Sequence, residues 1–373
     1  MHVFFRRSAP FLGALALTLA LIAPLVALAQ DDPDPDSAAP AGIGVARISL
    51  IEGSVAVQRG DSNDSLAAAQ NAPVLGGIDA SDDTGSSRGT AEVWRLAGPM
   101  HSGQRGRVRY RHNGRMLFAS LSIAEAEFAG ATIGGGASAL RRATEAGYRE
   151  MFGALETLAF PYPLRIWNFL SEINLASDDG ERYWHFNGAR QDVFIDLKRS
   201  IAGNVPAASA VGVAPSSPLT MYCIASAQAP IALENPRQCS AWDYPPQYGP
   251  RSPTFARACI SSDAPQTLFI SGTASIIGHA SAHVGDQREQ TRETVRNIRA
   301  LIGAANARLD GQRYRLEHLH YKVYVRQAEH QTSIDRELRH EVGAAARVLY
   351  LRADICRPDL LLEIEAVGTP EPL

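Results

Sequence analysis

The chain has 373 residues, of which 45% are hydrophobic and 20% are charged, and its formal net charge is -3. This length allows two domains with buried cores, and the composition excludes a disordered chain. The small negative charge argues against general nucleic-acid binding, because no basic excess exists to displace counterions from phosphates, so an anionic ligand must be met by local cations.

The first residues predict export. MHVFFRR is a short basic head, and the apolar run FLGALALTLALIAPLVALA ends in a small-x-small pattern before Gln30. We interpret residues 1–29 as a secretory signal peptide, with a transmembrane anchor as the alternative, and residues 30–42 as an acidic, Pro-rich linker. The expected location is periplasmic, with no membrane attachment after cleavage; if the N-terminal extension is not used, the protein is cytoplasmic.

Residues 43–90 form a separate front segment in this interpretation. Apolar and polar residues alternate from Ile43 to Val57 around a Glu-Gly pair, which predicts a β-hairpin. From Arg59 to Gly89 the chain is rich in Gly, Ser, Asp and Asn, and a long loop is expected. RISLIEGSVAVQRGDS followed by NAPVLGG resembles the small β-rich domain of exported FecR-like proteins.

Regular structure becomes denser after residue 90. AEVWRL, RGRVRYRH and MLFASLSI predict three strands of an antiparallel sheet, with Asn113-Gly114 as the turn between the second and third. The apolar spacing of Ser138 to Leu158 predicts a helix that packs on this sheet. RIWNFL predicts another buried strand, and a further helix is expected to open near Arg190. We assign residues 91–205 to an N-terminal domain.

Residues 206–373 mix strands and helices in a different order. Strands are expected at 210–213, 219–225 and 267–271, and Asp286 with Glu289 predicts a capping box at a helix start. RLEHLHYKVYVRQ, SIDRELRHEVG, ARVLYLRA and LLLEIEAV then predict strand, helix, strand and strand. The order favours an α+β (mixed α/β) fold, with a C-terminal mixed sheet that carries both helices on one face.

No motif calls for a metal or a cofactor. The four cysteines, Cys223, Cys239, Cys259 and Cys356, contain no C-x-x-C pair, so free thiols are expected, although export would permit disulfides. His279 and His283 lack a third ligand at a useful spacing, and no phosphate loop or dinucleotide fingerprint is present.

The segment Glu234 to Arg257, ENPRQCSAWDYPPQYGPRSPTFAR, is the most distinctive loop. Its prolines fix φ and remove backbone donors, so it is neither helix interior nor central strand. The arginine forks and tyrosine hydroxyls on such a stiff loop are suited to carboxylates or phosphates. The alternative is a solvated surface loop with aromatic plugs.

Several runs taken together resemble the chorismatase family, enzymes that hydrolyse the enol ether of chorismate. The runs are AEVWRLAGP, RIWNFLSEIN, ERYWHFNGAR, ENPRQ, YGPRSPTFARA, FISGTASIIGHASAHVGD, YKVYVR and RADICRPDLLLEIEA, in one order from Ala91 to Val367. The resemblance implies an N-terminal α/β domain packed on a C-terminal RidA/YjgF-like catalytic domain. It also implies release of pyruvate together with a dihydroxycyclohexadiene carboxylate or 3- or 4-hydroxybenzoate.

The resemblance also implies roles for individual residues. Glu363 of EIEA would be the acid that protonates the substrate, and Cys356 and Ala274 fall where the family's subclasses differ in product. A small dianion such as chorismate needs two cationic clamps, which arginines and tyrosines would supply. The expected substrate-binding residues are Tyr183, Arg190, Arg237, Tyr244, Tyr248, Arg251, Ala274, Cys356 and Glu365.

The residues around Glu363 suit proton donation. Protonating a carbon requires a carboxyl that stays protonated near neutral pH, which an apolar setting favours by raising its pKa. Glu363 lies in the apolar run LLLEIEA, and Glu365 points to the same face of the expected strand. Two such carboxylates must share a proton or meet cations, so one pKa should rise. The alternative is a pair of ion-pair partners for Arg352 or Arg357.

Two other functions remain open at this stage. A RidA-like imine deaminase would need only the C-terminal half and one arginine. An exported, non-catalytic binding module would fit the signal peptide, because chorismate is made in the cytoplasm. A monomer and a homotrimer are both compatible with the sequence.

Overall fold

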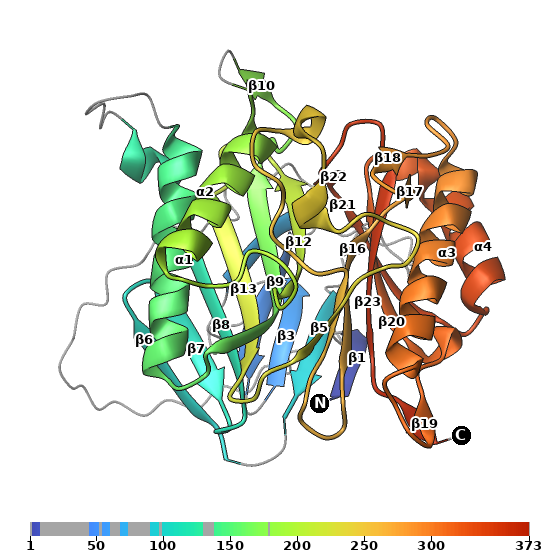
Figure 1. Ribbon diagram of the computed structural model, residues 1–373, viewed down its shortest axis with the longest axis horizontal. Coiled ribbons are helices and arrows are strands. Elements are labelled where there is room, and N and C mark those ends of the chain that lie inside the picture. The colour runs from blue at the N-terminus through green and yellow to red at the C-terminus, as the bar shows by residue number, and fades with distance from the viewer. Residues whose placement is uncertain are drawn as a thin grey trace, which may run out of the picture.

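The computed structural model describes residues 2–7, 45–51, 54–59, 68–73, 90–96, 99–129, 138–177 and 180–372, the first four ranges as backbone only. Two large sheets face each other, and each carries a pair of helices on its outer side, α1 and α2 on one and α3 and α4 on the other (Figure 1). The mixed α/β architecture expected from the sequence is confirmed.

A seven-stranded sheet forms the first half, in the order β22-β12-β9-β13-β8-β7-β6. Its only parallel pair is β9 with β12; the other neighbouring strands run antiparallel. The bounds are β6 His101–Arg105, β7 Val108–His112, β8 Met116–Ile123, β9 Tyr162–Ser171, β12 Ala207–Val213, β13 Leu219–Ser226 and β22 Asp354–Ile355.

Helices α1 (Ala139–Thr157) and α2 (Arg182–Asp196) cover the outer face of this sheet. Ser138 caps α1 by accepting a hydrogen bond from the Arg141 amide, as the sequence pattern predicts for this helix. The expected opening of α2 near Arg190 is wrong. The helix begins at Arg182, so Arg190 lies mid-helix on the buried face instead of in the first turn.

A six-stranded sheet forms the second half, in the order β14-β15-β16-β23-β20-β21. Helices α3 (Gln287–Asn306) and α4 (Gln331–Val342) both lie on its outer face, as expected (Figure 1). The bounds of the strands are β14 Ile231–Leu233, β15 Ala258–Ile260, β16 Leu268–Thr273, β20 His320–Val325, β21 Arg347–Arg352 and β23 Leu362–Gly368. Short hairpins are formed by β10 Ala176–Ser177 with β11 Gly180–Glu181, β17 Ile276–Ile277 with β18 Ala280–Ser281, and β19 Gln312–Arg313 with β24 Glu371–Pro372.

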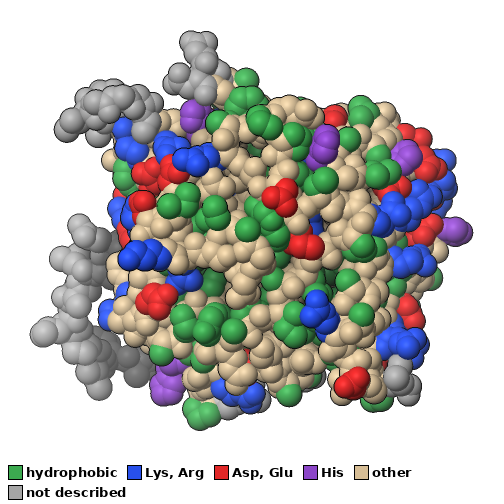
Figure 2. All heavy atoms as spheres, in the orientation of Figure 1, with side chains coloured by type: hydrophobic (Ala, Val, Ile, Leu, Met, Phe, Trp, Pro, Cys, Tyr) green, Lys and Arg blue, Asp and Glu red, His purple; other side chains and the backbone are tan. Residues whose placement is uncertain are grey.

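The start of α3 differs in one detail from the capping box. Asp286 accepts hydrogen bonds from the amides of Arg288 and Glu289, as predicted. The Glu289 carboxylate, however, pairs with Arg292. Figure 2 shows basic and acidic side chains interspersed on the side of the molecule where α3 and α4 lie, and ion pairs such as Arg292–Glu337 join the two helices there.

The inner faces of the two sheets share one apolar core. Trp94 stacks on Phe269 at a centroid distance of 5.8 Å and meets Trp167 edge-on at 6.1 Å. Phe169 and Tyr324 are buried in the same cluster. Because both sheets contribute to it, the core fixes how they sit relative to each other, and hence the site that forms between them.

Two predictions about strand membership are wrong. Strands β12 and β13 belong to the seven-stranded sheet, so that sheet runs past residue 205, where the sequence suggested a boundary. AEVWRL forms β5 (Thr90–Arg95), but β5 lies in a separate sheet, β1-β5-β3-β2-β4, and does not extend the β7–β8 hairpin. Hydrophobic alternation identifies a strand but not its neighbours, which long-range packing selects.

The front segment contains the predicted hairpin, formed by β2 (Val45–Ile51) and β3 (Ser54–Arg59). A strand, β4 (Ala68–Pro73), lies where a loop was expected. Strand β1 (His2–Arg7) pairs with β5, whereas residues 8–42, which hold most of the predicted signal peptide and the linker, lie outside the described residues. Among the described residues, no helix is both long and apolar enough to cross a membrane.

Candidate active site

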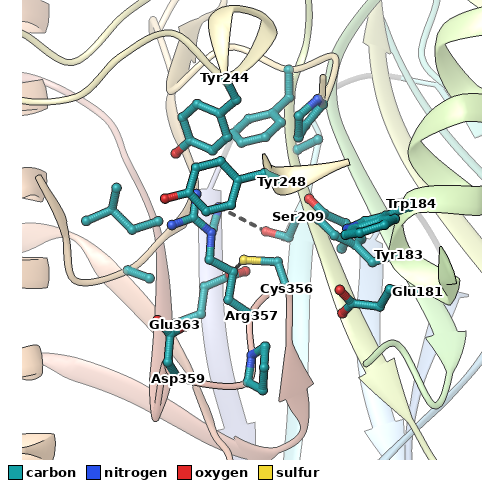
Figure 3. Close-up of a pocket in the computed structure, with 18 of the residues that line it drawn as sticks. Glu181, Tyr183, Trp184, Ser209, Tyr244, Tyr248, Cys356, Arg357, Asp359 and Glu363 are labelled. Carbon is teal, nitrogen blue, oxygen red and sulfur yellow. Dashed lines mark hydrogen bonds between the residues drawn. The ribbon is translucent and has the colours of Figure 1, made fainter. Parts of the chain in front are cut away.

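A cavity of about 400 Å³ lies where the two sheets meet, a volume typical of small-molecule sites. Its wall combines α2, β12 and the loop 244–257 with β16, the turn 356–359 and the start of β23. In Figure 3, Tyr183 and Trp184 lie on one side of the cavity and Glu363 on the other, with Tyr248, Arg357 and Cys356 between them. Both halves of the chain therefore build the site.

Glu363 presents a buried carboxyl to this cavity. Its side chain is 4% exposed, and its Oε1 has no hydrogen-bond partner among the described residues. Its Oε2 accepts only the weak donor of the Cys356 thiol, at 4.0 Å. Burial, and next the nearby Glu365 carboxylate, raise the pKa of Glu363 to about 8, against the opposing effect of Arg165. A protonated carboxyl with one oxygen free to act is suited to general acid catalysis.

Gly272 on β16 gives Glu363 room to reach the cavity. A Cβ atom at this position would lie 2.0 Å from Glu363 Oε1 and 2.9 Å from Ser209 Oγ. Real Cβ atoms do not approach other heavy atoms so closely, so any larger residue has to displace the carboxyl. The absence of a side chain at Gly272 therefore sets the position of the acid.

Glu365 lies two residues further along β23, in a different environment. Its oxygens accept hydrogen bonds from Trp167 Nε1 at 2.9 and 3.0 Å and from Ser209 Oγ at 2.9 Å, and Tyr324 OH lies 3.3 Å away. It also forms buried ion pairs with Lys322, at 2.7 Å, and Arg165. We name these residues the Glu365 cluster. Although burial alone would raise the pKa of Glu365, Lys322 and Arg165 outweigh burial and hold it to about 2.

Three buried arginines border the cavity: Arg190, Arg257 and Arg357. Each is held by part of its guanidinium group: Arg190 donates to Asn187, Arg257 to the Cys239 carbonyl and Tyr244 hydroxyl, and Arg357 to the His279 carbonyl. Each also retains a buried N–H without a partner among the described residues. Such prepared but unfilled donors suit an anionic ligand.

Aromatic rings hold Arg357 in place. Its guanidinium carbon lies 3.8 Å from the Tyr248 ring centroid and 5.1 Å from that of Tyr244. The two tyrosines pack at 5.4 Å, and the Tyr248 hydroxyl lies 3.3 Å from His279 Nδ1 (Figure 3). The proline-rich loop therefore positions its rings over a cation, as its stiffness suggested.

Seven of the ten predicted site residues line the cavity. They are Tyr183, Arg190, Tyr244, Tyr248, Ala274, Cys356 and Glu363. Burial raises the pKa of Tyr183 and raises that of the Cys356 thiol to about 12, so both are neutral groups at neutral pH.

The structure does not bring Arg237, Arg251 and Glu365 to the cavity wall. Arg237 is held by Glu293 and by Asn297 of α3, the latter at 2.9 Å. Arg251 is half exposed and lies 3.4 Å from Asp192. Glu365 is enclosed by its own cluster, beside a void of about 10 Å³ that has room for one water molecule at most. In each case a carboxylate or cation from a distant element takes the charge that the sequence assigned to a ligand.

Sequence reasoning missed several cavity residues. Arg257 and Arg357 were weighed only as structural groups, although both lie in runs of the family resemblance. Ser209, Gly272 and Trp184 carry no signal of their own in a single sequence. Two carboxylates, Glu181 and Asp359, also border the cavity, and Asp359 Oδ1 has no partner within the described part of the chain.

No group of three or more metal-ligating side chains occurs among the residues that the structure describes. His279 supports Tyr248, and His283 Nε2 lies 3.5 Å from Glu293. All four cysteines are free thiols.

The chain is similar to characterised proteins over most of its length. Residues 92–225 match a family model described as Chorismatase FkbO/Hyg5-like, N-terminal. A 3-hydroxybenzoate synthase of Streptomyces hygroscopicus is 34% identical over 287 residues, which cover 74% of this chain and 81% of that protein. A chorismatase of Streptomyces rapamycinicus is 35% identical over 285 residues, with the same coverage of each chain. A chorismatase crystal structure matches with a TM-score of 0.70 at 29% identity, covering 90% of this chain and 96% of that one.

Proposed function

The chain belongs to the chorismatase family, and on that basis we propose that it hydrolyses the enol ether of chorismate and releases pyruvate. One observation carries the proposal. The buried Glu363 carboxyl has a free oxygen at a cavity bordered by three arginines that each keep an unpaired N–H among the described residues. A protonated acid opposite prepared cations is what hydrolysis of a dianionic enol ether requires.

The arginines account for the binding of the substrate. Chorismate carries two carboxylates, a ring hydroxyl and an enolpyruvyl ether. Arg190 on α2 and the pair Arg257 and Arg357 border the cavity from different elements and are suited to one carboxylate each. Tyr244 and Tyr248 keep Arg357 planar against their rings, which limits the entropy lost when it binds the ligand.

Glu363 accounts for the chemistry. Its proton passes to the methylene carbon of the enolpyruvyl group, and the resulting oxocarbenium ion is trapped by water. The hemiketal then collapses to pyruvate and the ring product. Because carbon is a poor base, the acid must be protonated when the substrate binds, and a pKa of about 8 meets that condition at neutral pH.

The ring product depends on the residues beside the acid. Cys356 and Ala274 border the cavity, and the Cys356 thiol is the nearest side-chain donor to Glu363. The product is a dihydroxycyclohexadiene carboxylate if water alone completes the reaction, or a hydroxybenzoate if the ring hydroxyl takes part. Identifying the ring product by mass spectrometry and chromatography against standards distinguishes these outcomes.

Export belongs to the proposal on the strength of the sequence alone. The basic head and apolar run of residues 1–29 support cleavage near Gln30 and a periplasmic protein. Cell fractionation followed by N-terminal sequencing tests this. A cytoplasmic protein that retains Met1 would overturn export and leave the enzymatic proposal intact.

The decisive experiment incubates the purified full-length chain with chorismate and follows pyruvate. We expect turnover by the wild type and its near-complete loss in Glu363→Gln, which keeps the shape of the side chain but has no acidic proton. Arg190→Met serves a second purpose, because a RidA-like imine deaminase that uses only the C-terminal half would retain imine hydrolysis. The absence of pyruvate above the Glu363→Gln level would overturn the proposed function.

A further inference from the structure

The Glu365 cluster has no role in the proposed reaction so far, yet it lies directly behind the acid. Glu363 and Glu365 are on the same face of β23, and Ser209 connects the cavity wall to the cluster. The Ser209 oxygen accepts hydrogen bonds from the Gly272 amide, at 3.0 Å, and from Arg165. Its single proton is therefore committed to Glu365, 2.9 Å away.

The charges of the cluster are unequal. Two cations, Arg165 and Lys322, share the one carboxylate of Glu365, and all three side chains are at most 6% exposed. Arg165 Nη1 also lacks a partner among the described residues. Buried cations that are not neutralised favour a negative charge on the nearest carboxyl, and here the nearest other carboxyl is the acid Glu363.

We propose that Glu365 is a positioning residue for the reaction: it neutralises Arg165 and Lys322, so that Glu363 stays protonated until the substrate arrives. This inference rests on the proposed function. Once Glu363 has given up its proton, two carboxylates balance two cations, so the same cluster also stabilises the state after proton transfer. A hydrophobic pocket alone would oppose that ionised state.

Glu365 does not act as a second acid. It does not border the cavity, and both of its oxygens already accept several hydrogen bonds, three of them from the buried donors Trp167 and Ser209. The void beside the cluster is too small for a substrate. Its influence on the reaction therefore passes through Glu363.

Other groups around Glu363 must be considered in any pH measurement. They are Glu365 on its own strand, Arg165 on β9, Lys322 and Tyr324 on β20, Cys356, Arg357 and Asp359 in the preceding turn, and Tyr183 and Arg190 on α2. The acidic members besides Glu365 are neutral thiol and phenol groups, apart from Asp359 at the cavity wall. Glu365 is therefore the fixed anion whose removal should change the ionisation of Glu363 most.

The test compares full-length Glu365→Gln with Glu365→Asp by the pH profile of kcat/KM for chorismate. Both substitutions disturb packing, but only Glu365→Gln removes the charge. In Glu365→Gln the alkaline limb should move to lower pH by one unit or more, which lowers the rate about tenfold per unit above the limb and restores it below. In Glu365→Asp the limb should stay within a few tenths of a unit of the wild type.

A second variant guards against loss of folding, since one buried carboxylate removed from two cations is destabilising. Glu365→Gln/Lys322→Met removes one charge of each sign and should show the same shift of the limb. A uniform loss of rate with an unmoved limb in Glu365→Gln and the double variant would overturn the proposal, and so would an equal shift in Glu365→Asp.

A readout that needs no turnover separates this proposal from the proposed function. Infrared difference titration of the resting protein, with the protonated carboxyl band assigned by its absence in Glu363→Gln, follows Glu363 directly. If the wild type fails to release pyruvate but the band still titrates at lower pH in Glu365→Gln, the positioning role holds and the substrate assignment fails. A band that titrates alike in both overturns the positioning role.

Discussion

Replacing Gly272 with alanine tests whether the position of Glu363 controls the rate. The added Cβ would lie 2.0 Å from Glu363 Oε1, 2.5 Å from its carboxyl carbon and 2.9 Å from Ser209 Oγ. To reach ordinary van der Waals contact, the carboxyl must retreat by more than about 1 Å. Since the side chain is buried against the Glu365 cluster, it has little free space to move into.

Two effects of known size should follow in Gly272→Ala. A displacement of about 1 Å at a reacting group typically costs about 100-fold in rate, so kcat for pyruvate release should fall by that order. Overpacking typically costs about 1–3 kcal/mol, which thermal unfolding would record as a lower Tm.

The matched control is Gly303→Ala on the exposed side of α3, where an added Cβ meets no atom within 4 Å. It should leave kcat unchanged and stabilise the helix by up to about 1 kcal/mol. Stopped chorismate assays and calorimetry on the three proteins decide the matter. Wild-type kcat and Tm in Gly272→Ala would refute the reasoning, because the acid would then work from a position that the structure excludes.

Three further predictions concern the same cavity. Glu363→Gln should lower kcat by about 10²- to 10⁴-fold, the usual contribution of a general acid, with little change in KM, and steady-state kinetics would reveal a contrary effect confined to KM. The same variant should change the pH dependence of stability: folding raises the pKa of Glu363 from 4.5 to about 8, so its stabilising contribution is complete below the lower value and is lost as pH rises through the higher. Melting curves should therefore show Glu363→Gln gaining on the wild type across that window, and parallel curves would contradict the burial argument. Arg357→Met should lower kcat/KM by about 10- to 100-fold, mostly through KM, because a charge-assisted hydrogen bond contributes about 1.5–3 kcal/mol. Arg251→Met, which removes a pair with Asp192 outside the cavity, should change kcat/KM less than about twofold, and equal effects of the two arginine variants would count against the assignment.

Much of the second half could be predicted because its signals are local. Helix α3 begins at Asp286 and buries Val295, Ile298 and Leu301, as the capping residue and the helical spacing indicate. The run LLLEIEA becomes the buried strand β23, and the alternation of a strand puts Glu363 and Glu365 on one face. These features depend on neighbours within a few residues, which a single sequence displays.

Partners across sheets could not be predicted in the same way. AEVWRL is a strand but pairs with β1 and β3 in a separate sheet, and the cap residue Glu289 chooses Arg292. Arg237, expected at a ligand, instead meets Glu293 of α3. A cation takes whichever carboxylate the fold brings within reach, and that choice depends on elements far away in the chain.

The sequence by itself determined where the acid sits: an apolar strand with two carboxylates on one face, in a series of runs that resemble the chorismatase family. Only the tertiary structure decided which carboxylate stays protonated and which arginines remain open to a ligand. The physical reason is that ionisation depends on distance and burial. Arg165 meets Glu365 across 200 residues of chain, and that contact makes Glu365 the anion and leaves Glu363 as the acid.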